Sequence, residues 1–553
     1  MWNESFIEHH KENPTCDGHL EVDLEAERQR GLCWIERLYC RKCSYTSKYH
    51  ELFEGVRMGR RGPKTAGPNC AVQVALLQTP ISNTSLNKIL LASNLPAPSK
   101  TSMQRTGKLV QQVVKNTNIE DMNRHLHQSN TVNNARGEPR DTIAIETDGL
   151  FNNPLYSGVG KTLIQPSTQA VLLGAENVTG DRKVVSVVTR NKLCAVGSRT
   201  SNPCPDHDGI CTANLALEEN IGNEEAMAQE CIEGILQHGI EVGELTTDGD
   251  SAAYRAAERL YASGKMKCRP VHFLDTRHLS DNQRKKIKCT EFSPSFFTAA
   301  TKKQKESLQA RFALDLSKRC VAEFQTAMNM FSADITKVKR AMSYTTHCLV
   351  KCYQGDHRDC TKRSFVCKGT KSNNWVSRST YMPKSFNCVT CTDSDEEKLH
   401  QCIIYRLSQA MIEKTKKNRN TQKVEAVNRS LRRSLPRNVT YPTSMEGRVH
   451  AAVHSVNNRP GSSIAKLCQK VGCSIKANTR VSRGLLRVNK DTDRSKNYNS
   501  SQKAKVQRVR KRIKMNYVYD NRPTSLRKEP YKKAMVEQAI ADHTYSNCTY
   551  MKN

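Results

Sequence analysis

Two acidic residues occur in the same short sequence, Thr-Asp-Gly, at positions 147–149 and 247–249. Each follows an apolar run of strand-like composition, so Asp148 and Asp248 are expected at strand ends, where the glycine leaves the carboxylate unobstructed. If the two strands pair, both carboxylates can bind the same divalent ions, because two-metal phosphodiester chemistry needs ions about 3.5–4 Å apart and Mg²⁺ and Mn²⁺ prefer oxygen ligands. Asp250 is an alternative to Asp248, and a single Asp-Gly pair is also a common turn.

Cysteine and histidine residues gather near the N-terminus. Cys40 and Cys43 form a C-x2-C pair, and Cys16 and His19 have the same short spacing upstream. Such pairs are typical of zinc ligands carried on tight turns. The pattern predicts a zinc site made by Cys16, His19, Cys40 and Cys43. The alternative is that these residues are small buried side chains.

Two further Cys/His groups follow along the chain. One predicted zinc set consists of Cys352, His357, Cys360 and Cys367, with Cys348 as an alternative to Cys352. A second set lies in a loop too polar to pack in a core and consists of Cys194, Cys204, His207 and Cys211. Cys388 and Cys391 form one more C-x2-C pair. Because thiolates select zinc and carboxylates select magnesium, we expect structural Zn²⁺ and catalytic Mg²⁺ at separate sites.

The charge of the chain indicates a polyanionic partner. Lys and Arg number 87 against 54 Asp and Glu, a net charge of +33. Such a surplus repels itself unless phosphates neutralise part of it, which favours nucleic acid over a membrane surface. No apolar run approaches the ~20 residues of a membrane span, and the first residues lack an apolar signal core. We therefore expect an intracellular protein, with cysteines that are reduced or bound to metal.

Composition and periodicity divide the chain into six segments. They are a zinc-ribbon-like module (1–55), a helical DNA-binding or dimerisation region (56–140), the first part of an α/β core (141–290), a helical Cys/His-bearing insertion (291–400), the helix and glutamate segment that complete the core (401–460), and a basic, partly disordered tail (461–553). A plain helical linker is an equally good interpretation of 56–140. The basic run 503–514 suits a nuclear-localisation patch, a DNA-binding tail or a solvated helix face.

The segment 141–290 has a characteristic order of elements. The strand ending at Asp148 precedes a hairpin around the turn Gly180-Asp181, and a helix over about 222–240 follows. The strand ending at Asp248, a helix stopped by Gly264 and a last strand before Asp275 complete the segment. The predicted order is β-β-β-α-β-α-β.

This order resembles the ribonuclease-H-like fold of integrases and DDE transposases. In that family the first Asp ends the first strand, the second Asp follows the fourth strand, and a Glu lies on a late helix, often after an insertion. Asp148, Asp248 and Glu425 follow in that order. Asp275-Thr-Arg-His278 resembles the (C/D)xxH motif of eukaryotic Mutator-like, Kolobok and related transposases. The stretch around Glu425, NTQKVEAVNRSLRRSLPRN, resembles the family's glutamate helix.

The chain is most similar to the animal branch of Mutator-like transposases over about residues 10–460, with Kolobok transposases as a close alternative. The resemblance implies that Asp148, Asp248 and Glu425 bind two Mg²⁺ or Mn²⁺ ions. These activate water to cut the element end, and the freed 3′-hydroxyl then attacks target DNA. His278 would orient the scissile phosphate or the DNA end, or alternatively bond near Asp275. Glu146, on the other face from Thr147, is expected to be structural.

The same resemblance implies the partners and the location. We expect double-stranded DNA with terminal inverted repeats, a target DNA, a homodimer or larger assembly that joins two ends, and a nuclear location. One alternative is a domesticated DNA-binding zinc protein that has lost catalysis. Another is a metal-dependent nuclease on the same fold that does not join strands.

Overall fold

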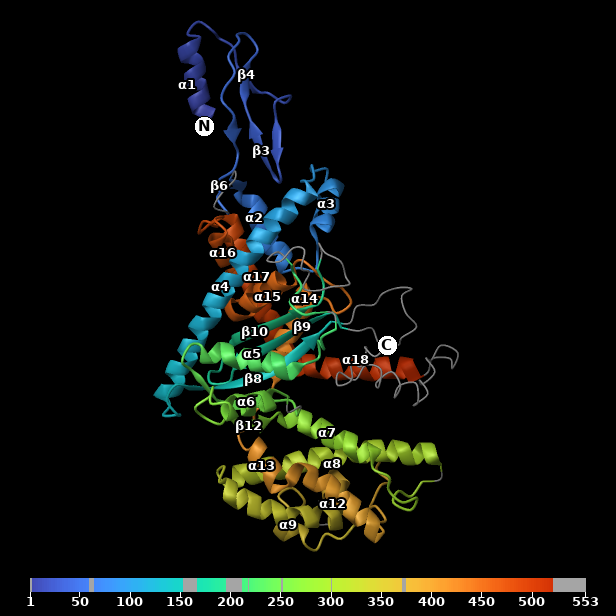
Figure 1. Cartoon of the computed structure of the whole chain (residues 1–553). Helices are drawn as coiled ribbons and strands as arrows, with labels where there is room; N and C mark the ends of the chain where they lie inside the picture. The colour runs from blue at the N-terminus through green and yellow to red at the C-terminus, as the bar shows by residue number, and fades with distance from the viewer. Residues whose placement is uncertain are drawn as a thin grey trace, which may run out of the picture.

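The chain forms an elongated molecule with three tiers (Figure 1). The computed structural model describes residues 2–58, 64–152, 167–194, 211–216, 218–249, 252–299, 301–369 and 374–520. An N-terminal module lies at one end, a mixed sheet covered by helices lies in the middle, and a separate helical domain lies at the other end. Among the described helices, none has the length and apolar character that would let it cross a lipid bilayer.

The N-terminal module combines one helix with short strands. Helix α1 (Trp2–Glu12) precedes β1 (Leu20–Val22) and β4 (Leu38–Cys40), which pair with each other, and β2 (Arg28–Arg30), β3 (Cys33–Glu36) and β5 (His50–Glu51), which form a three-stranded antiparallel sheet. Strands β6 (Gly55–Val56) and β7 (Thr65–Ala66) pair at the exit from the module. Few apolar side chains are available here, so the module depends on its Cys/His group.

Three helices connect this module to the sheet. They are α2 (Gly67–Leu77), α3 (Asn83–Ala92) and α4 (Lys100–Ala135). Helix α4 has 36 residues, a length of about 54 Å at 1.5 Å per residue. Val110 and Val114 of α4 pack with α2 and the C-terminal helices, and Met122 packs under the sheet. The long helix therefore ties the upper tier to the central tier.

The central sheet has five strands in the order β10-β9-β8-β11-β12. Their bounds are β8 (Thr142–Phe151), β9 (Gln169–Glu176), β10 (Val184–Asn191), β11 (Glu241–Thr247) and β12 (Val271–Leu274), with α5 (Glu224–Leu236) and α6 (Ala252–Ala262) on either side of β11 in the chain. The hairpin β9–β10 and the pair β8–β9 are antiparallel, whereas β11 is parallel to β8 and to β12. The β-β-β-α-β-α-β order expected from the sequence is present.

Both faces of the sheet are covered, as the apolar character of its strands requires. Ile143 and Ile145 of β8 pack with α5 and α6 on one face. Leu150 of β8, with Val171 and Leu173 of β9, packs with α14 (Gln422–Ser434), α15 (Met445–Asn458) and α4 on the other face. Alternate residues of one strand thus serve two cores, and the face under α14 is the one that contains Asp148.

The lower tier is a helical domain with its own core. It consists of α7 (Thr276–Cys289), α8 (Lys302–Met330), α9 (Ile335–Tyr353), the short α10 (Cys360–Arg363) and α11 (Trp375–Arg378), α12 (Asp393–Leu407) and α13 (Gln409–Thr415). We expected the helix after residue 401 to belong to the α/β core. Instead, the core of the helical domain is completed by Cys402, Ile403, Leu407 and Ile412. Ser408 adopts an extended conformation, ends α12 and starts α13, so both helices pack in this domain.

The C-terminal segment is more ordered than its composition indicated. We expected a partly disordered tail from residue 461, but residues up to 520 form α16 (Pro460–Lys470), α17 (Arg480–Ser500) and α18 (Gln502–Asp520). Leu467 and Cys468 of α16 pack with α2 and α4. Helix α18, which contains the basic run, extends from the central tier (Figure 1).

The separate core of the helical domain predicts separable stability. Phe312 is fully buried among the rings of Phe296, Phe297 and Tyr353. Phe312→Ala should lower the free energy of unfolding of this domain by about 3–5 kcal/mol. Hydrogen exchange followed by mass spectrometry should then show faster exchange in α8, α9 and α12 but not in β8 or β11.

Tyr344→Ala is the matched control, since this ring on α9 is 51% exposed and its removal leaves no cavity. Equal acceleration of exchange across the sheet in Phe312→Ala would show that the two cores unfold as one unit.

Candidate functional site

Three aspartates follow three adjacent parallel segments of the sheet. The parallel pairing of β8 with β11 ends at Glu146 and Thr246, so Asp148 and Asp248 lie two positions beyond it on neighbouring strands. Asp148 was expected to end its strand, but β8 continues to Phe151 because it stays paired with β9 there. Thr247 of β11 pairs with Leu274 of β12, and the next residue, Asp275, donates its N–H to the Thr247 carbonyl at 2.8 Å. Asp148, Asp248 and Asp275 therefore lie together at the end of the sheet towards which β8, β11 and β12 run, and we call this end the sheet edge. Asp250, the alternative to Asp248, lies outside the described residues.

Helix α14 brings Glu425 to the same edge through hydrogen bonds around its first turns. The Asp275 Oδ2 atom accepts from the Thr421 N–H at 2.7 Å and from the Thr421 hydroxyl at 3.0 Å. The Glu146 Oε1 atom accepts from the Val424 N–H at 2.9 Å. These carboxylates satisfy N–H groups that a helix start leaves unpaired. Glu146 is therefore a structural residue, as its position in the sequence indicated.

His278 lies between the aspartates and Glu425. Its Nε2 atom is 2.8 Å from the Glu425 Oε1 atom, and ligand atoms of Asp275, His278 and Glu425 all lie within 4.8 Å of one another. Burial lowers the pKa of His278, but the hydrogen bond to Glu425 and the charges of Asp275 and Asp248 outweigh it, so its pKa is raised. The histidine is thus held close to the carboxylates as a hydrogen-bond donor or a cation.

The carboxylate of Asp275 is already occupied by the protein. Besides Thr421, it accepts hydrogen bonds from the N–H groups of Arg277 at 2.6 Å and His278 at 3.0 Å, and it is fully buried. With four donors on two oxygens, it has no free lone pair for a metal. This favours a positioning role for Asp275, which orients both His278 and the helix that carries Glu425.

The acidic side chains at this edge repel one another. The pKa of Asp148 is raised to about 6, chiefly by burial and also by the charges of Asp248 and Glu425, while hydrogen bonds from Asn428 and from the Gly149 N–H oppose the rise. Burial likewise raises the pKa of Glu146 to about 7, against the N–H of Val424 and the charge of Arg182. A divalent cation would relieve this repulsion, so the donor set suits a hard metal ion.

Two residues at this edge were not found from the sequence. Asn428 donates from Nδ2 to the Asp148 Oδ2 atom at 2.8 Å. Its position three residues after Glu425, on the same helix face, is the signal that would have found it. Glu224, at the start of α5, lines the same cleft as Asp148 and Asp248, and its sequence context contains no comparable signal.

The N-terminal Cys/His group contains His9 where the sequence spacing predicted His19. Ligand atoms of His9, Cys16, Cys40 and Cys43 lie within 4.8 Å of one another, with His9 Nε2 3.3 Å from Cys43 Sγ. His19 is exposed and outside this group. The spacing of Cys16 and His19 indicates ligands on one turn, whereas α1 packs back against the strands and brings His9 to the group from an earlier part of the chain.

Backbone N–H groups donate to two of these thiols and favour the ionised form of Cys40. The N–H groups of Gly18 and Lys42 donate to the Sγ atoms of Cys16 and Cys40, each at 3.4 Å. Burial raises the pKa of Cys40, but hydrogen bonds from the N–H groups of Cys43 and Lys42 lower it to about 6. Because the thiolate is the metal-binding form, the group suits Zn²⁺.

The second Cys/His group gathers all four of its predicted residues. Ligand atoms of Cys352, His357, Cys360 and Cys367 lie within 4.8 Å of one another. The His357 Nδ1 atom is 3.2 Å from Cys352 Sγ and 3.5 Å from Cys360 Sγ. The alternative Cys348 lies beside the group, 3.9 Å from Cys360 Sγ, but is outside it.

A buried arginine supports negative charge on this group. Arg319 is fully buried and donates from Nη1 to the Cys352 Sγ atom at 3.0 Å. Hydrogen bonds from Cys352 and Cys360 hold the pKa of Cys367 well below its usual value. A buried guanidinium needs a nearby anion; Glu323, which is also fully buried, provides one at 3.3 Å, and thiolates bound to a zinc ion would provide a second on the side of Cys352.

The remaining cysteine predictions do not give a close Cys/His group among the described residues. Cys204 and His207 lie outside the described residues, while Cys194 and Cys211 lie near each other beside Ala213. Cys388 is exposed, and Cys391 belongs to none of the close Cys/His/acid groups within the described chain.

Comparison with known proteins identifies a family whose model matches the chain. A family model described as Mutator-like transposase matches residues 1–367, more than half of the chain. The matched segment contains Asp148, Asp248, Asp275 and His278 and both close Cys/His groups, whereas Glu425 follows it. No curated protein matches the chain.

The two Cys/His groups predict about two zinc ions per chain. His9→Ala and Cys360→Ser should each remove about one of them, as measured by metal analysis of the purified protein. His19→Ala is the matched control for His9→Ala and should leave the zinc content unchanged. Loss of zinc in His19→Ala with retention in His9→Ala would restore the set predicted from the sequence.

The raised pKa of Asp148 predicts a pH-dependent metal affinity. Protons compete with the metal below pH 6, so the affinity for Mn²⁺ should rise about tenfold between pH 5 and pH 7. Isothermal titration calorimetry measures this. Asn428→Ala removes a hydrogen bond that lowers this pKa, so the rise should move to higher pH, whereas Asn438→Ala, at an exposed site, should not move it. A flat profile in the unmodified protein would contradict this account of Asp148.

Proposed function

The chain belongs to the Mutator-like transposase family, and on that premise we propose that it is a DDE-type transposase that cuts and joins DNA. In this proposal Asp148, Asp248 and Glu425 bind two divalent ions, Mg²⁺ or Mn²⁺. The observation that carries it is the docking of α14, which brings Glu425 and the Asp148-bound Asn428 to the sheet edge where Asp148 and Asp248 lie. The strand order supports assignment of the core to the ribonuclease-H-like fold.

The proposal assigns two ions to the three carboxylates. Their oxygen atoms are not all within the 4.8 Å that unites the other acid and Cys/His groups of the described chain. Two ions about 3.5–4 Å apart, each with oxygen ligands at about 2.1 Å, span roughly 8 Å between outer ligands. The charges of Asp248 and Glu425 raise the pKa of Asp148, which supports the proposal that the three acids act on the same ions.

The chain's own residues would divide the work of this reaction. A pair of bound Mg²⁺ ions would supply an activated hydroxide and neutralise charge on the attacked phosphate. Asn428 holds one oxygen of Asp148 and leaves the other toward the cleft. His278, bonded to Glu425, would orient that carboxylate and present a positive charge to the DNA phosphate. Asp275 fixes the geometry of both.

Structural zinc would stabilise the two Cys/His groups. Three thiolates and one neutral histidine around Zn²⁺ carry a net charge of −1, which Arg319 would neutralise at the second group. The aromatic rings of Tyr353 and Trp375 lie 5.3 and 5.7 Å from the Arg319 guanidinium and enclose it. Arg319 also pairs with the buried Glu323 at 3.3 Å, so the zinc-bound thiolates would share this guanidinium with a carboxylate.

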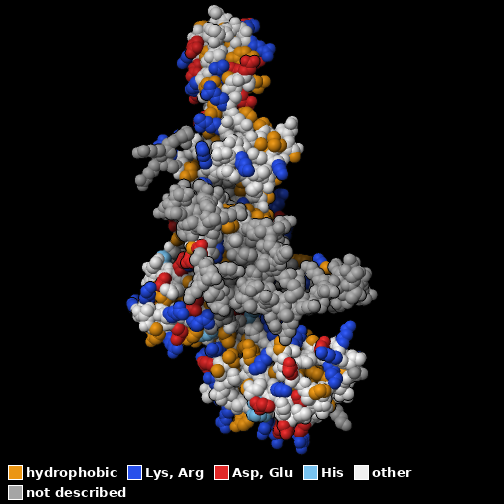
Figure 2. All heavy atoms as spheres, turned by 45° about the vertical axis from the view of Figure 1, so that its right-hand side comes forward, with side chains coloured by type: hydrophobic (Ala, Val, Ile, Leu, Met, Phe, Trp, Pro, Cys, Tyr) orange, Lys and Arg blue, Asp and Glu red, His pale blue; other side chains and the backbone are white. Residues whose placement is uncertain are grey.

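The charge distribution supports DNA as the partner. The chain has a net charge of +33, and Figure 2 shows Lys and Arg side chains over both ends of the molecule. Double-stranded DNA with terminal inverted repeats and a target DNA are the substrates in this proposal. Nuclear location and a homodimer or larger assembly, which would bring two ends together, belong to the same proposal.

A DNA-binding zinc protein without catalysis remains the second candidate, and substitution of the acids separates it from a transposase. Asp148→Asn, Asp248→Asn and Glu425→Gln should each reduce Mn²⁺-dependent nicking of supercoiled plasmid about 100-fold or more, because each removes a metal ligand. Their affinity for DNA should change little. Joining of a labelled 3′-hydroxyl oligonucleotide to the plasmid distinguishes a transposase from a simple nuclease.

Asp281→Asn is the matched control, since this half-buried acid on α7 pairs with Arg284 at 3.6 Å and belongs to none of the described acid or Cys/His groups. Nicking by the three variants at the level of the unmodified protein would exclude these acids from catalysis. Absence of nicking in the unmodified protein, with DNA binding retained, would favour the second candidate.

A further inference from the structure

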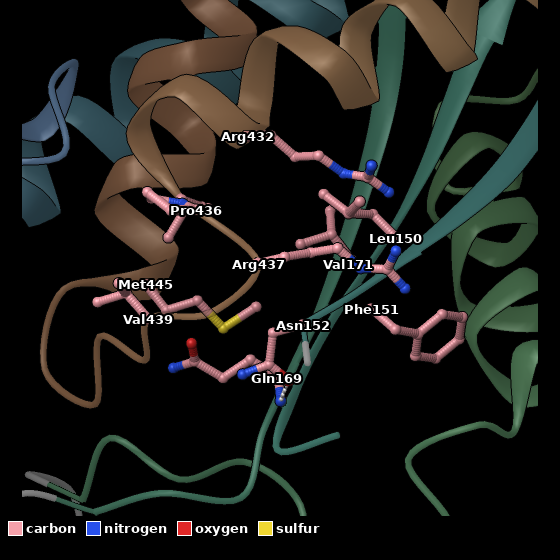
Figure 3. A pocket seen from close by; sticks show the side chains of 11 residues that line it. Leu150, Phe151, Asn152, Gln169, Val171, Arg432, Pro436, Arg437, Val439 and Met445 are labelled. Carbon is pink, nitrogen blue, oxygen red and sulfur yellow. Dashed lines mark hydrogen bonds between the residues drawn. The ribbon is translucent and has the colours of Figure 1, made fainter. Parts of the chain in front are cut away.

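A recess lies beside the candidate catalytic edge, between the sheet and the end of α14. Figure 3 shows Arg432 and Arg437 extending in the same direction across the strand residues Leu150 and Val171, with Pro436, Val439 and Met445 on the opposite side. Asn152 and Gln169 lie at its lower end. We call this feature the arginine recess.

The arginine recess lies next to the carboxylates along β8 and α14. Leu150 is two residues after Asp148 and therefore on the same face of β8, and it pairs with Val171 of β9. On α14, Glu425, Asn428 and Arg432 are separated by three and four residues, so they lie along one helix face. Arg432 is seven residues, or about 10.5 Å, from Glu425 along the helix. Stacked DNA rises about 3.4 Å per nucleotide, so this distance corresponds to about three nucleotides or fewer.

Among the described residues, Arg432 and Arg437 have no hydrogen-bonded or ion-paired carboxylate partner. Within the described part of the chain, neither guanidinium takes part in a hydrogen bond or ion pair with another residue, and both side chains are exposed. Partial burial and the charge of Arg437 lower the pKa of Arg432, while Asp148 opposes them. Two guanidiniums held side by side without a carboxylate suit a phosphate, which accepts the paired N–H donors of arginine.

The lining between the two arginines is apolar, and its two side-chain amides are already hydrogen-bonded within the protein. Leu150, Val171 and Met445 are buried side chains. The Asn152 Oδ1 atom accepts from the N–H groups of Thr168 at 2.9 Å and Gln169 at 3.0 Å. The Gln169 Nε2 atom donates to Asn191 at 3.1 Å. The apolar surface that a ligand can contact therefore comes from Val439, which is 39% exposed, and from the half-buried Phe151 and Pro436. Because both amides are engaged, they cannot read the edge of a base.

We propose that the arginine recess binds an unpaired nucleotide of the DNA strand next to the cleaved bond. Arg432 and Arg437 hold its phosphate, and its sugar and base lie on the apolar lining. The inference rests on the proposed function for the position of the cleaved bond. A nucleotide in an intact duplex hides its base faces in the stack, so only a locally opened strand can present an apolar face here. With no free amide, the recess accepts any base.

The test compares DNA binding by the full-length protein without added Mg²⁺ or Mn²⁺. The probes are a labelled 30-base-pair duplex, blunt or with three unpaired thymidines as a 3′ or a 5′ tail. The unmodified protein should bind at least one tailed duplex about fivefold or more tightly than the blunt one, the effect expected for one stacked base. Arg432→Gln/Arg437→Gln should abolish this ratio and reduce the salt dependence by about one phosphate contact.

Two further variants separate the phosphate contact from the apolar contact. Val439→Trp, at a site 39% exposed, should fill the recess and remove the tail preference while the salt dependence stays unchanged. Arg433→Gln, on an exposed part of α14 outside the recess, and Val481→Trp, on exposed α17, are the matched controls and should keep the preference.

An equal tail preference in the unmodified protein and in Arg432→Gln/Arg437→Gln, or no preference in the unmodified protein, would overturn the proposal. Because this assay measures binding without cleavage, that result would leave the nicking experiment on Asp148, Asp248 and Glu425 unaffected. Conversely, nicking that survives loss of those acids would remove the proposed function, even if the tail preference were present.

Discussion

The site depends on the hydrogen bonds that the carboxylate of Asp275 accepts. It is fully buried and accepts hydrogen bonds from the first turn of α7 and from Thr421, at the start of α14. One side chain thus joins the end of β12, the helix that carries His278 and the helix that carries Glu425. Loss of a buried carboxylate with four donors would leave those donors unsatisfied, at about 1–3 kcal/mol each. The relative positions of His278 and Glu425 follow from it.

The second constraint is electrostatic. A chain with a large positive net charge gathers acids at one edge of its sheet, where burial and mutual repulsion raise the pKa values of Asp148 and Glu146. Such an arrangement is unfavourable without cations, and its presence in a chain otherwise suited to phosphates is a reason to regard it as functional. Arg432 and Arg437 lie next to these acids. They would hold the phosphate backbone against the acids only when metal ions neutralise the negative charges of both the acids and the phosphates.

Local patterns predicted the strands and the Cys/His group after α9 well, because both depend on short-range spacing. Apolar runs and turn residues indicated β8, the hairpin β9–β10 and β11, and the residues from Cys352 to Cys367 lie within one stretch of chain. Contacts set by tertiary packing were not predictable in this way. His9 reaches its partners because α1 folds back, and the helices beyond residue 460 are held by α2 and α4, which no periodicity of their own reveals.

The chain enters and leaves the helical domain at nearly the same point. The Thr276 N–H donates to the Arg419 carbonyl at 3.3 Å, although more than 140 residues separate the two. The helical domain is therefore an insertion, and its length does not change the positions of the acids at the sheet edge. Proteins with the same three acids can differ widely in the number of residues before the glutamate, and that number says nothing about how far apart the acids lie in space.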